Sequence, residues 1–217
     1  MIAVVDYGIG NLGSVTKGFR RAGAEVELSG DPEVLRRADA LVLPGDGAFA
    51  AAMAEIEGRG LTPVLREAIE RGTPLLGICI GMQLLFEESE EHGQYRGLGV
   101  LPGRVRRFEG ELPVPHMGWN TLRSRRPHPV MDGVEDGAHV YFVHSYYCDA
   151  SDDVVIAASD YGREFPAIVG RGNVLGLQFH PEKSQGVGLR LAANFVRSIA
   201  ARGVHPREMI RHTEGAA

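Results

Sequence analysis

Short runs of consecutive apolar residues alternate with stretches of helical periodicity over the first ninety residues of the chain. The runs at 2–5, 40–43 and 75–78 contain no charged or strongly polar side chain. Strands that are apolar throughout are typical of a parallel sheet covered on both faces, because both sides of each strand are then buried. Between the runs, apolar residues return every three or four positions, as in 61–71, which predicts helices. The pattern predicts an α/β fold with an open, mostly parallel central sheet flanked by helices. The expected strands of this half are residues 2–5, 24–28, 40–43 and 75–78, and the expected helices are residues 14–22, 33–37, 49–56, 61–71 and 82 to about 91.

From Gly97 onward the pattern changes to short alternating runs separated by glycine and proline. Alternation of apolar and polar residues indicates strands with one exposed face, so we expect a mixed or antiparallel β section here. Residues 187–201 return to helical spacing and predict a closing helix. Because no linker or repeat separates the halves, we expect a single domain over 1–203, followed by a polar tail at 204–217. The strands expected in this section are residues 103–108, 119–122, 139–143, 154–159, 167–169 and 174–179.

Composition and charge narrow the class of protein. The 217 residues are 44% hydrophobic and 24% charged, which is ordinary for a globular chain, and the net charge of −5 argues against a nucleic-acid partner. Two cysteines are too few for the disulfide scaffold of a small secreted protein. The first residues lack the charged start and long apolar segment of a signal peptide, and no apolar stretch is long enough to cross a bilayer. We therefore expect a cytoplasmic protein that binds neither nucleic acid nor membrane.

The run at 75–78 leads into Gly77-Ile-Cys79-Ile-Gly81, which has the form of a nucleophile elbow with cysteine in place of serine. In such an elbow a strand turns sharply into a helix, and a side chain at either glycine would collide with its surroundings. The first N–H groups of the helix point at whatever binds beside the central residue and favour a negative charge there. A cysteine between glycines is also common as an inert core residue, so the choice depends on its partners.

A cysteine nucleophile needs a base within hydrogen-bonding reach, and the base needs an orienting acceptor. Of the eight histidines, His180 stands at the end of the apolar run 174–179, at a sheet edge where α/β proteins build their sites. Glu182 follows two positions later, and Pro181 disfavours helical geometry at His180, so the carboxylate can bind the imidazole nitrogen that faces away from the sulfur. A surface His–Glu pair is the alternative, but the Cys79 elbow at another strand end favours the catalytic interpretation.

An oxyanion hole would complete such a site. One donor is expected at the Ile80 N–H, and the other in the glycine-rich loop 44–47, which follows a buried strand. A metal ion held by Cys79, His180 and Glu182 is a weak alternative, because no paired Cys or His spacing supports it.

A second glycine-rich loop follows the first strand. Gly8-x-Gly10-x-x-Gly13 matches the spacing of a dinucleotide-binding loop, but no acidic residue at the end of the next strand is placed to bind a ribose. We expect a plain loop here, without a nucleotide cofactor.

Three motifs together carry a resemblance to a known family. These motifs are Gly77-Ile-Cys-Ile-Gly-Met-Gln83, Pro44-Gly-Asp-Gly47 and Phe179-His-Pro-Glu182. Their order and spacing resemble those of the class I, triad-type glutamine amidotransferases, and the resemblance covers essentially the whole chain. More narrowly, the chain is similar to the glutaminase subunits of imidazole glycerol phosphate synthase, a histidine-biosynthesis enzyme. That similarity rests on the motifs at residues 6–11, 115–120, 142–146 and 180–184. The resemblance implies a flavodoxin-like α/β fold.

The resemblance also implies a role for each matching residue. Cys79 would be the nucleophile, His180 the acid and base, and Glu182 the residue that orients it. The oxyanion hole would use backbone groups of Asp46, Gly47 and Ile80. Glutamine would be bound by Gly47, Gln83, His144, Ser145 and Tyr146, and the partner interface would include Gly10, Asn11, Trp119 and Tyr141. Asp46 departs from the family, which commonly has valine there; because the donor is a backbone N–H, the chemistry survives this change.

The implied partner is a (β/α)8 cyclase in a one-to-one heterodimer. The cyclase would use the ammonia to make imidazole glycerol phosphate and AICAR ribonucleotide, and this chain would need no cofactor or metal of its own. Two other classes stay open. A stand-alone cysteine hydrolase such as a γ-glutamyl peptidase, or a glutaminase subunit of another amidotransferase, would use the same triad. A catalytically silent binding module would have no need for all three triad residues.

Overall fold

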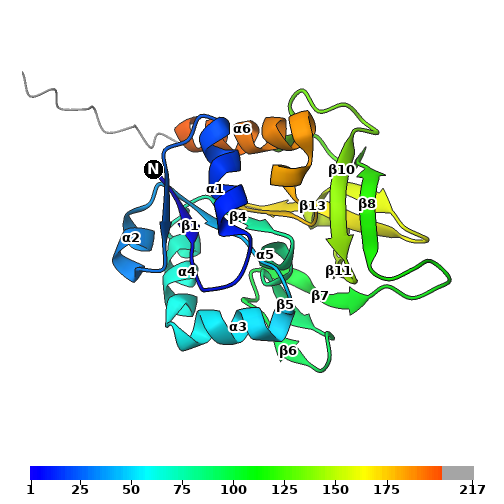
Figure 1. Ribbon diagram of the computed structural model, residues 1–217, viewed down its shortest axis with the longest axis horizontal. Helices are drawn as coiled ribbons and strands as arrows, with labels where there is room; N and C mark the ends of the chain where they lie inside the picture. Colours follow the sequence, from blue (N-terminus) through cyan, green and yellow to red (C-terminus); the bar gives the residue numbers. More distant parts are fainter. Residues whose placement is uncertain (202–217) are drawn as a thin grey trace, which may run out of the picture.

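The computed structural model describes residues 1–201 (Figure 1). The polar tail expected at 204–217 lies outside the described residues. None of the helices in the described part combines the length and the apolar character needed to cross a membrane.

A mixed sheet of eight strands forms the centre of the fold. In sheet order its strands are β2 (Val26–Ser29), β1 (Ile2–Val5), β3 (Ala40–Leu43), β4 (Leu75–Ile78), β14 (Val174–Leu177), β13 (Glu164–Arg171), β12 (Val155–Asp160) and β9 (Arg123–Ser124). The first five are parallel, and the last three continue the sheet as antiparallel strands. The parallel part has the strand order of a flavodoxin-like, doubly wound fold. Strands β1, β3, β4 and β14 are buried at every position, as the continuous apolar runs predict.

Helices cover both faces of this sheet (Figure 1). They are α1 (Leu12–Arg21), α2 (Pro32–Arg37), α3 (Phe49–Gly58), α4 (Leu61–Glu70), the short α5 (Ile80–Gln83) and α6 (Gln185–Ala201). Helices α1 and α6 lie together on one face, where the rings of Phe19 and Phe195 meet edge to face with centroids 6.2 Å apart. Helices α3 and α4 lie on the other face, and α2 packs against α4.

Two smaller sheets complete the fold, and most of their strands come from the section after Gly97, where the alternating pattern predicts strands. One pairs β8 (His116–Thr121) with β10 (His139–His144), and the other has the order β11 (Tyr146–Ala150), β7 (Leu101–Arg107), β5 (Phe86–Ser89) and β6 (Tyr95–Arg96). Single 3-10 turns lie at η1 (Pro129–Met131), η2 (Asp152–Val154) and η3 (Pro181–Lys183).

The helix expected from 82 to about 91 is wrong. Helix α5 ends at Gln83, and the carbonyl oxygens of the buried residues 84–86 accept N–H groups from residues 98–101 instead of from a following helical turn. Tertiary pairing with a distant segment therefore overrides the local helical pattern, and the chain continues as strand β5.

The parallel strands bring three of the expected site segments to one edge of the sheet. In the register of these strands, Leu43 lies opposite Gly77, and Ile78 lies opposite Leu177. The loop starting at Pro44, the elbow at Cys79 and the segment leading to His180 therefore emerge side by side at the carboxyl ends of β3, β4 and β14, where ligands bind in open α/β sheets.

Candidate active site

Cys79 occupies the sharp turn between β4 and α5. Its φ is 54° and its ψ is −113°, a backbone conformation that is rare for a residue with a side chain. The two flanking glycines make room for this turn. A Cβ on Gly77 would lie 2.4 Å from the carbonyl oxygen of Gly81, and a Cβ on Gly81 would lie 1.8 Å from the carbonyl oxygen of Leu43. The turn has the strained geometry that the elbow motif predicts.

His180 and Glu182 form a buried pair just beyond β14. Nδ1 of His180 lies 2.8 Å from Oε1 of Glu182, and the two side chains are only 7% and 3% exposed. The backbone of this segment is fixed as well, because the His180 N–H donates to the carbonyl oxygen of Tyr141 and the His180 carbonyl accepts the Ser184 hydroxyl. With Nδ1 engaged by the carboxylate, Nε2 is the nitrogen available to Cys79.

The environment of His180 favours its protonated form. Burial by itself lowers the pKa of the imidazole, but hydrogen bonds to Cys79 and Glu182, with their negative charges, outweigh burial and raise the pKa of His180 to about 9. The site therefore holds a proton on His180 near neutral pH, beside the sulfur of Cys79.

The expected oxyanion donors lie next to Cys79, but one of them is engaged. Ile80 is the first residue of α5, where a backbone N–H has no acceptor inside the helix. Gly47 has a φ of 76°, and its N–H donates to Oδ1 of Asp46 at 2.8 Å. The carboxylate of Asp46 thus occupies the N–H of Gly47 that the family resemblance assigns to the oxyanion.

A cavity of about 230 Å³ opens beside Cys79. It is lined by Asp46, Gly47, Cys79, Ile80, Gln83, Glu91, Pro115, Val143, His144, Ser145 and Tyr146. All of the residues expected to bind glutamine are among them, so the structure brings the expected substrate residues to one cavity wall.

The side-chain amide of Gln83 is held in place by hydrogen bonds to other residues of the protein. Its Nε2 donates to the carbonyl oxygen of Tyr146 at 3.0 Å and to Oε1 of Gln178 at 3.1 Å. Its own Oε1 is buried, and no described residue donates to it. Gln83 therefore fixes the position of Tyr146 in addition to lining the cavity.

Two polar residues of the site were missed in the sequence. Glu91 lines the cavity, is buried, and accepts the Phe49 N–H at 2.5 Å. The sequence pattern predicts Glu91 at the end of a helix that the structure does not form, and therefore gives no sign of its place in the site. Gln178 lies with its Nε2 4.0 Å from Sγ of Cys79. Its position two residues before His180 on an extended segment was a usable signal, because such residues point to the same side.

The residues expected at a partner interface fall into two groups. Trp119 and Tyr141 are opposite each other on β8 and β10, with ring centroids 5.9 Å apart. Gly10 and Asn11 lie in another segment, where the Asn11 side chain accepts the Ser14 N–H and caps α1. The structure joins the aromatic pair on one sheet face and places the other two residues at the start of a helix.

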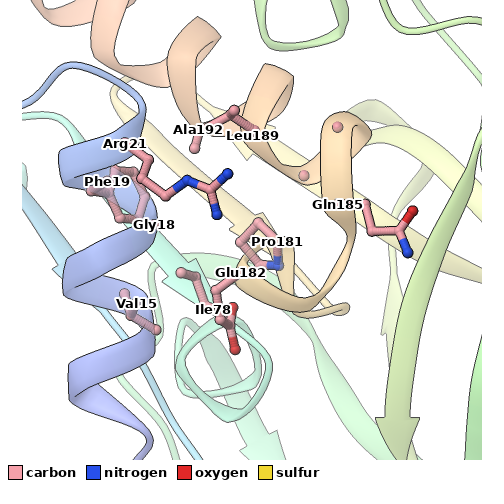
Figure 2. A pocket seen from close by; sticks show the side chains of 12 residues that line it. Val15, Gly18, Phe19, Arg21, Ile78, Pro181, Glu182, Gln185, Leu189 and Ala192 are labelled. Atoms are coloured by element: carbon pink, nitrogen blue, oxygen red, sulfur yellow. The ribbon is translucent and has the colours of Figure 1, made fainter.

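A second cavity, of about 350 Å³, lies behind Glu182 (Figure 2). Its walls come from α1, from η3 and from the first turns of α6, and Cys79 does not line it. In Figure 2 Glu182 and Ile78 lie at one end of this cavity, and Arg21 and Leu189 lie at the other. The carboxylate of Glu182 is therefore backed by a hollow between two helices.

Comparison with known proteins shows to which class this chain belongs. The sequence model of the family "Glutamine amidotransferase class-I" matches residues 3–199. A curated relative from Geobacillus kaustophilus (strain HTA426), named imidazole glycerol phosphate synthase subunit HisH, is 55% identical over 210 residues, which cover 94% of this chain and 99% of the relative. The subunit of the same name from Syntrophotalea carbinolica (strain DSM 2380 / NBRC 103641 / GraBd1) is 52% identical over 204 residues, covering 90% and 98%. The chain therefore belongs to the class-I glutamine amidotransferases and, within them, to the family of the synthase subunit HisH.

Solved structures agree with the fold. A crystal structure of a glutamine amidotransferase superposes with a TM-score of 0.73 at 24% identity, covering 92% of this chain and 98% of that one. The structure of PurLQS from Thermotoga maritima gives 0.69 at 21% identity, covering 93% and 97%. At these identities the likeness shows the fold alone, and it confirms the predicted α/β architecture.

Proposed function

We propose that this chain is the glutaminase subunit of imidazole glycerol phosphate synthase and that it hydrolyses glutamine through Cys79, His180 and Glu182. One observation carries the proposal: a buried, hydrogen-bonded imidazole–carboxylate pair, whose imidazole pKa is raised by Cys79, a cysteine of positive φ, as well as by the carboxylate. This is the arrangement of nucleophile, base and orienter that covalent catalysis needs. A catalytically silent binding module has no use for a strained cysteine in such contacts.

In the first half of the reaction, the Cys79 thiolate attacks the side-chain carbonyl carbon of glutamine. The carbonyl oxygen takes up the negative charge next to the Ile80 N–H and the 46–47 loop. His180 gives its proton to the side-chain nitrogen as the C–N bond breaks. Ammonia leaves, and a γ-glutamyl thioester remains on the sulfur.

In the second half, the neutral His180 takes a proton from a water molecule whose oxygen attacks the thioester. The C–S bond breaks, glutamate leaves, and the thiolate and the imidazolium are restored. Glu182 keeps the imidazole oriented through both halves.

The cavity also suits the amino-acid end of glutamine. A bound α-ammonium group needs an anionic acceptor, and among the lining residues the carboxylates are those of Asp46 and Glu91. Glu91 is buried in the wall and fixed by the Phe49 N–H, whereas Asp46 is exposed and bonded within its own loop. We therefore assign the ammonium contact to Glu91, with Gln83 and the 144–146 segment completing the wall.

The product explains why a partner is needed. Free ammonia is mostly protonated at neutral pH and is then no nucleophile, so a covered route to an acceptor preserves its reactivity. We propose a (β/α)8 cyclase as the partner, in a one-to-one heterodimer that makes imidazole glycerol phosphate and AICAR ribonucleotide in histidine biosynthesis. Residues 1–203 would act as one domain, in the cytoplasm and without a cofactor.

An exposed apolar face supports this docking site. Met117 and Trp119 on β8 are 62% and 47% exposed, although large apolar side chains are usually covered. Met117 lies opposite Val143, which lines the cavity, and Trp119 lies opposite Tyr141. The face is therefore continuous with the cavity in which ammonia would form.

The test is Cys79→Ala in the complex with a cyclase. We expect glutamine-dependent synthesis to be abolished, because the nucleophile is lost, and synthesis from added ammonia to persist, because the cyclase is untouched. Equal loss of both activities contradicts the assignment. Assays of the chain without a cyclase on glutamine and on γ-glutamyl peptides separate the proposal from a stand-alone peptidase, which would prefer the peptides and need no partner.

A further inference from the structure

A network of polar groups runs from strand β8 to the wall of the catalytic cavity, with the buried imidazoles of His116 and His144 at its centre. Nδ2 of Asn120 lies 3.2 Å from Nε2 of His116, and Nδ1 of His116 lies 2.9 Å from Nε2 of His144. Nδ1 of His144 lies 2.8 Å from the carbonyl oxygen of Tyr146. At its other end, Nδ2 of Asn120 donates to the carbonyl oxygen of Asp160 at 2.7 Å. Neither imidazole belongs to the proposed triad, and neither takes part in the proposed proton transfers.

One arrangement of protons satisfies every hydrogen bond of this network. The carbonyl oxygen of Tyr146 can only accept, so His144 carries its proton on Nδ1, and its Nε2 is an acceptor. His116 must then donate from Nδ1, which leaves its Nε2 to accept from Asn120. The second hydrogen of the Asn120 amide goes to Asp160. The Tyr146 carbonyl at one end and the Asn120 amide at the other thus favour the same tautomer of His144, and the donor at Asn120 supports it through His116.

The surroundings keep both imidazoles neutral, as this arrangement requires. His116 and His144 are 3% and 6% exposed, and His116 is stacked against the rings of Tyr161 and Phe142, with centroids 4.1 Å and 4.9 Å away. Burial lowers the pKa of His116 to about 4 and that of His144 to about 3.

This hydrogen-bond network ends at a segment, residues 144–146, that would contact glutamine. Residues 144–146 line the cavity between β10 and β11. The carbonyl of Tyr146 is held by His144 and Gln83, and the carbonyl of Ser145 accepts the Phe108 N–H at 3.0 Å. Both oxygens are thus engaged by protein donors, so the segment does not present free carbonyls to the carboxylate of a bound amino acid.

We infer that Asn120 and His116 are positioning residues for glutamine: through the tautomer of His144 they lock the Tyr146 carbonyl and so shape the substrate wall. This inference rests on the proposed function. Asn120 directly follows Trp119 on β8. The same strand therefore carries both the proposed docking face and the start of the relay, which ties the substrate wall to the strand that would meet the partner.

The test replaces His116 by phenylalanine, whose ring keeps the stacking but cannot donate to His144. In the complex with a cyclase we expect the KM for glutamine to rise about tenfold with a smaller change in kcat, because a buried acceptor loses its donor while the triad is intact. His116→Gln, which can accept and donate at once, is expected to restore KM to within about threefold of wild type. Thr121→Val on the same strand, outside the relay, is expected to leave KM unchanged.

Nitrogen-15 NMR of the imidazoles adds a readout that a merely structural role would not move. We expect His144 protonated at Nδ1 in the wild type, and a changed tautomer in His116→Phe and in Asn120→Asp, which offers only acceptors to His116. An unchanged KM, or a tautomer of His144 that does not respond to either variant, overturns the inference. If the wild-type complex does not hydrolyse glutamine, the proposed function fails, while the tautomer measurement still decides whether the relay exists.

Discussion

In the proposed mechanism, Glu182 supplies the charge on which the acid–base chemistry of His180 depends. Its Oε1 lies 2.8 Å from Nδ1 of His180, and together with Cys79 it raises the pKa of the imidazole to about 9 against the effect of burial. Glu182→Gln keeps an acceptor at this position and removes the charge, so the pKa of His180 falls. In the proposed mechanism the protonated imidazole donates to the leaving nitrogen, so we expect activity to be lost as pH rises through that pKa. We expect the alkaline limb of kcat/KM to move to lower pH.

The measurement is the pH profile of glutamine hydrolysis across the neutral and alkaline range. Glu57→Gln serves as the control, since it removes an exposed carboxylate from α3, away from the site. An alkaline limb that stays in place in Glu182→Gln would show that Glu182 does not set the charge of His180.

We expect Asp46 to restrain one donor of the proposed oxyanion hole. Its carboxylate accepts the Gly47 N–H at 2.8 Å and thereby competes with a developing oxyanion for that donor. We expect Asp46→Val to raise glutamine hydrolysis by the chain without partner about threefold to tenfold, because one hydrogen bond of about 1 kcal/mol no longer has to be broken.

Asp46→Asn is the matched control for this effect. Asparagine keeps the side-chain oxygen that accepts the Gly47 N–H but removes the charge, so we expect a smaller increase than with valine. The measurement is the rate of glutamine hydrolysis by wild type, Asp46→Val and Asp46→Asn under saturating glutamine. Equal rates in wild type and Asp46→Val would mean that the Asp46 bond does not restrain the loop.

At the scale of elements, prediction succeeded where the local pattern and the tertiary pairing agree. The strands expected at 2–5, 40–43 and 75–78 match β1, β3 and β4 to the residue, because each is apolar throughout and buried on both faces. The helix expected at 82–91 does not form, because the N–H groups of residues 98–101 donate to the carbonyl oxygens of residues 84–86. No local sequence pattern encodes that pairing.

The residues of the candidate site also fall into those that the sequence predicts and those that it does not. Cys79, His180 and Glu182 could be found because strand ends and short spacings bring them together. Glu91 could not, since its place in the cavity depends on strand β5, where the sequence pattern predicts a helix. The bond between Asp46 and Gly47 depends on the orientation of one peptide plane, which the motif does not determine.

The elbow between β4 and α5 yields a prediction about packing. A Cβ at Gly81 would lie 1.8 Å from the carbonyl oxygen of Leu43, and both partners are backbone. We expect Gly81→Ala to lower the free energy of unfolding by about 3 kcal/mol or more and to abolish activity, because β3 and α5 must move apart. Gly13→Ala is the control: it lies in α1 with nothing within 4 Å of its Cβ, and we expect it to stabilise the protein by about 0.5–1 kcal/mol. Denaturant unfolding measures both, and a stable Gly81→Ala protein would contradict the tight contact.

At the scale of the whole molecule, the proposal assigns different tasks to two regions of the chain. The parallel sheet and its helices hold Cys79 and His180 on strand ends, and the β8–β10 pair stands at the end of the molecule away from α2 (Figure 1). Val143 of β10 lines the cavity, so the exposed face of this pair leads from solvent to the sulfur. Docking of a second protein on that face would cover the opening and keep ammonia from water.

Trp119 is the residue on which we expect that docking to depend most. Large aromatic side chains at the centre of an interface typically cost about 2 kcal/mol or more when truncated, which is about thirtyfold in affinity. We therefore expect Trp119→Ala to weaken binding of the cyclase by about that factor in titration calorimetry, while the fold, judged by thermal unfolding, is unchanged because the ring is half exposed. Tyr95→Ala is the matched control, since this aromatic residue is 39% exposed on β6, in a different sheet. If both variants bind the cyclase as tightly as wild type, the partner docks elsewhere, and the route from Cys79 to the acceptor must leave the cavity by another side.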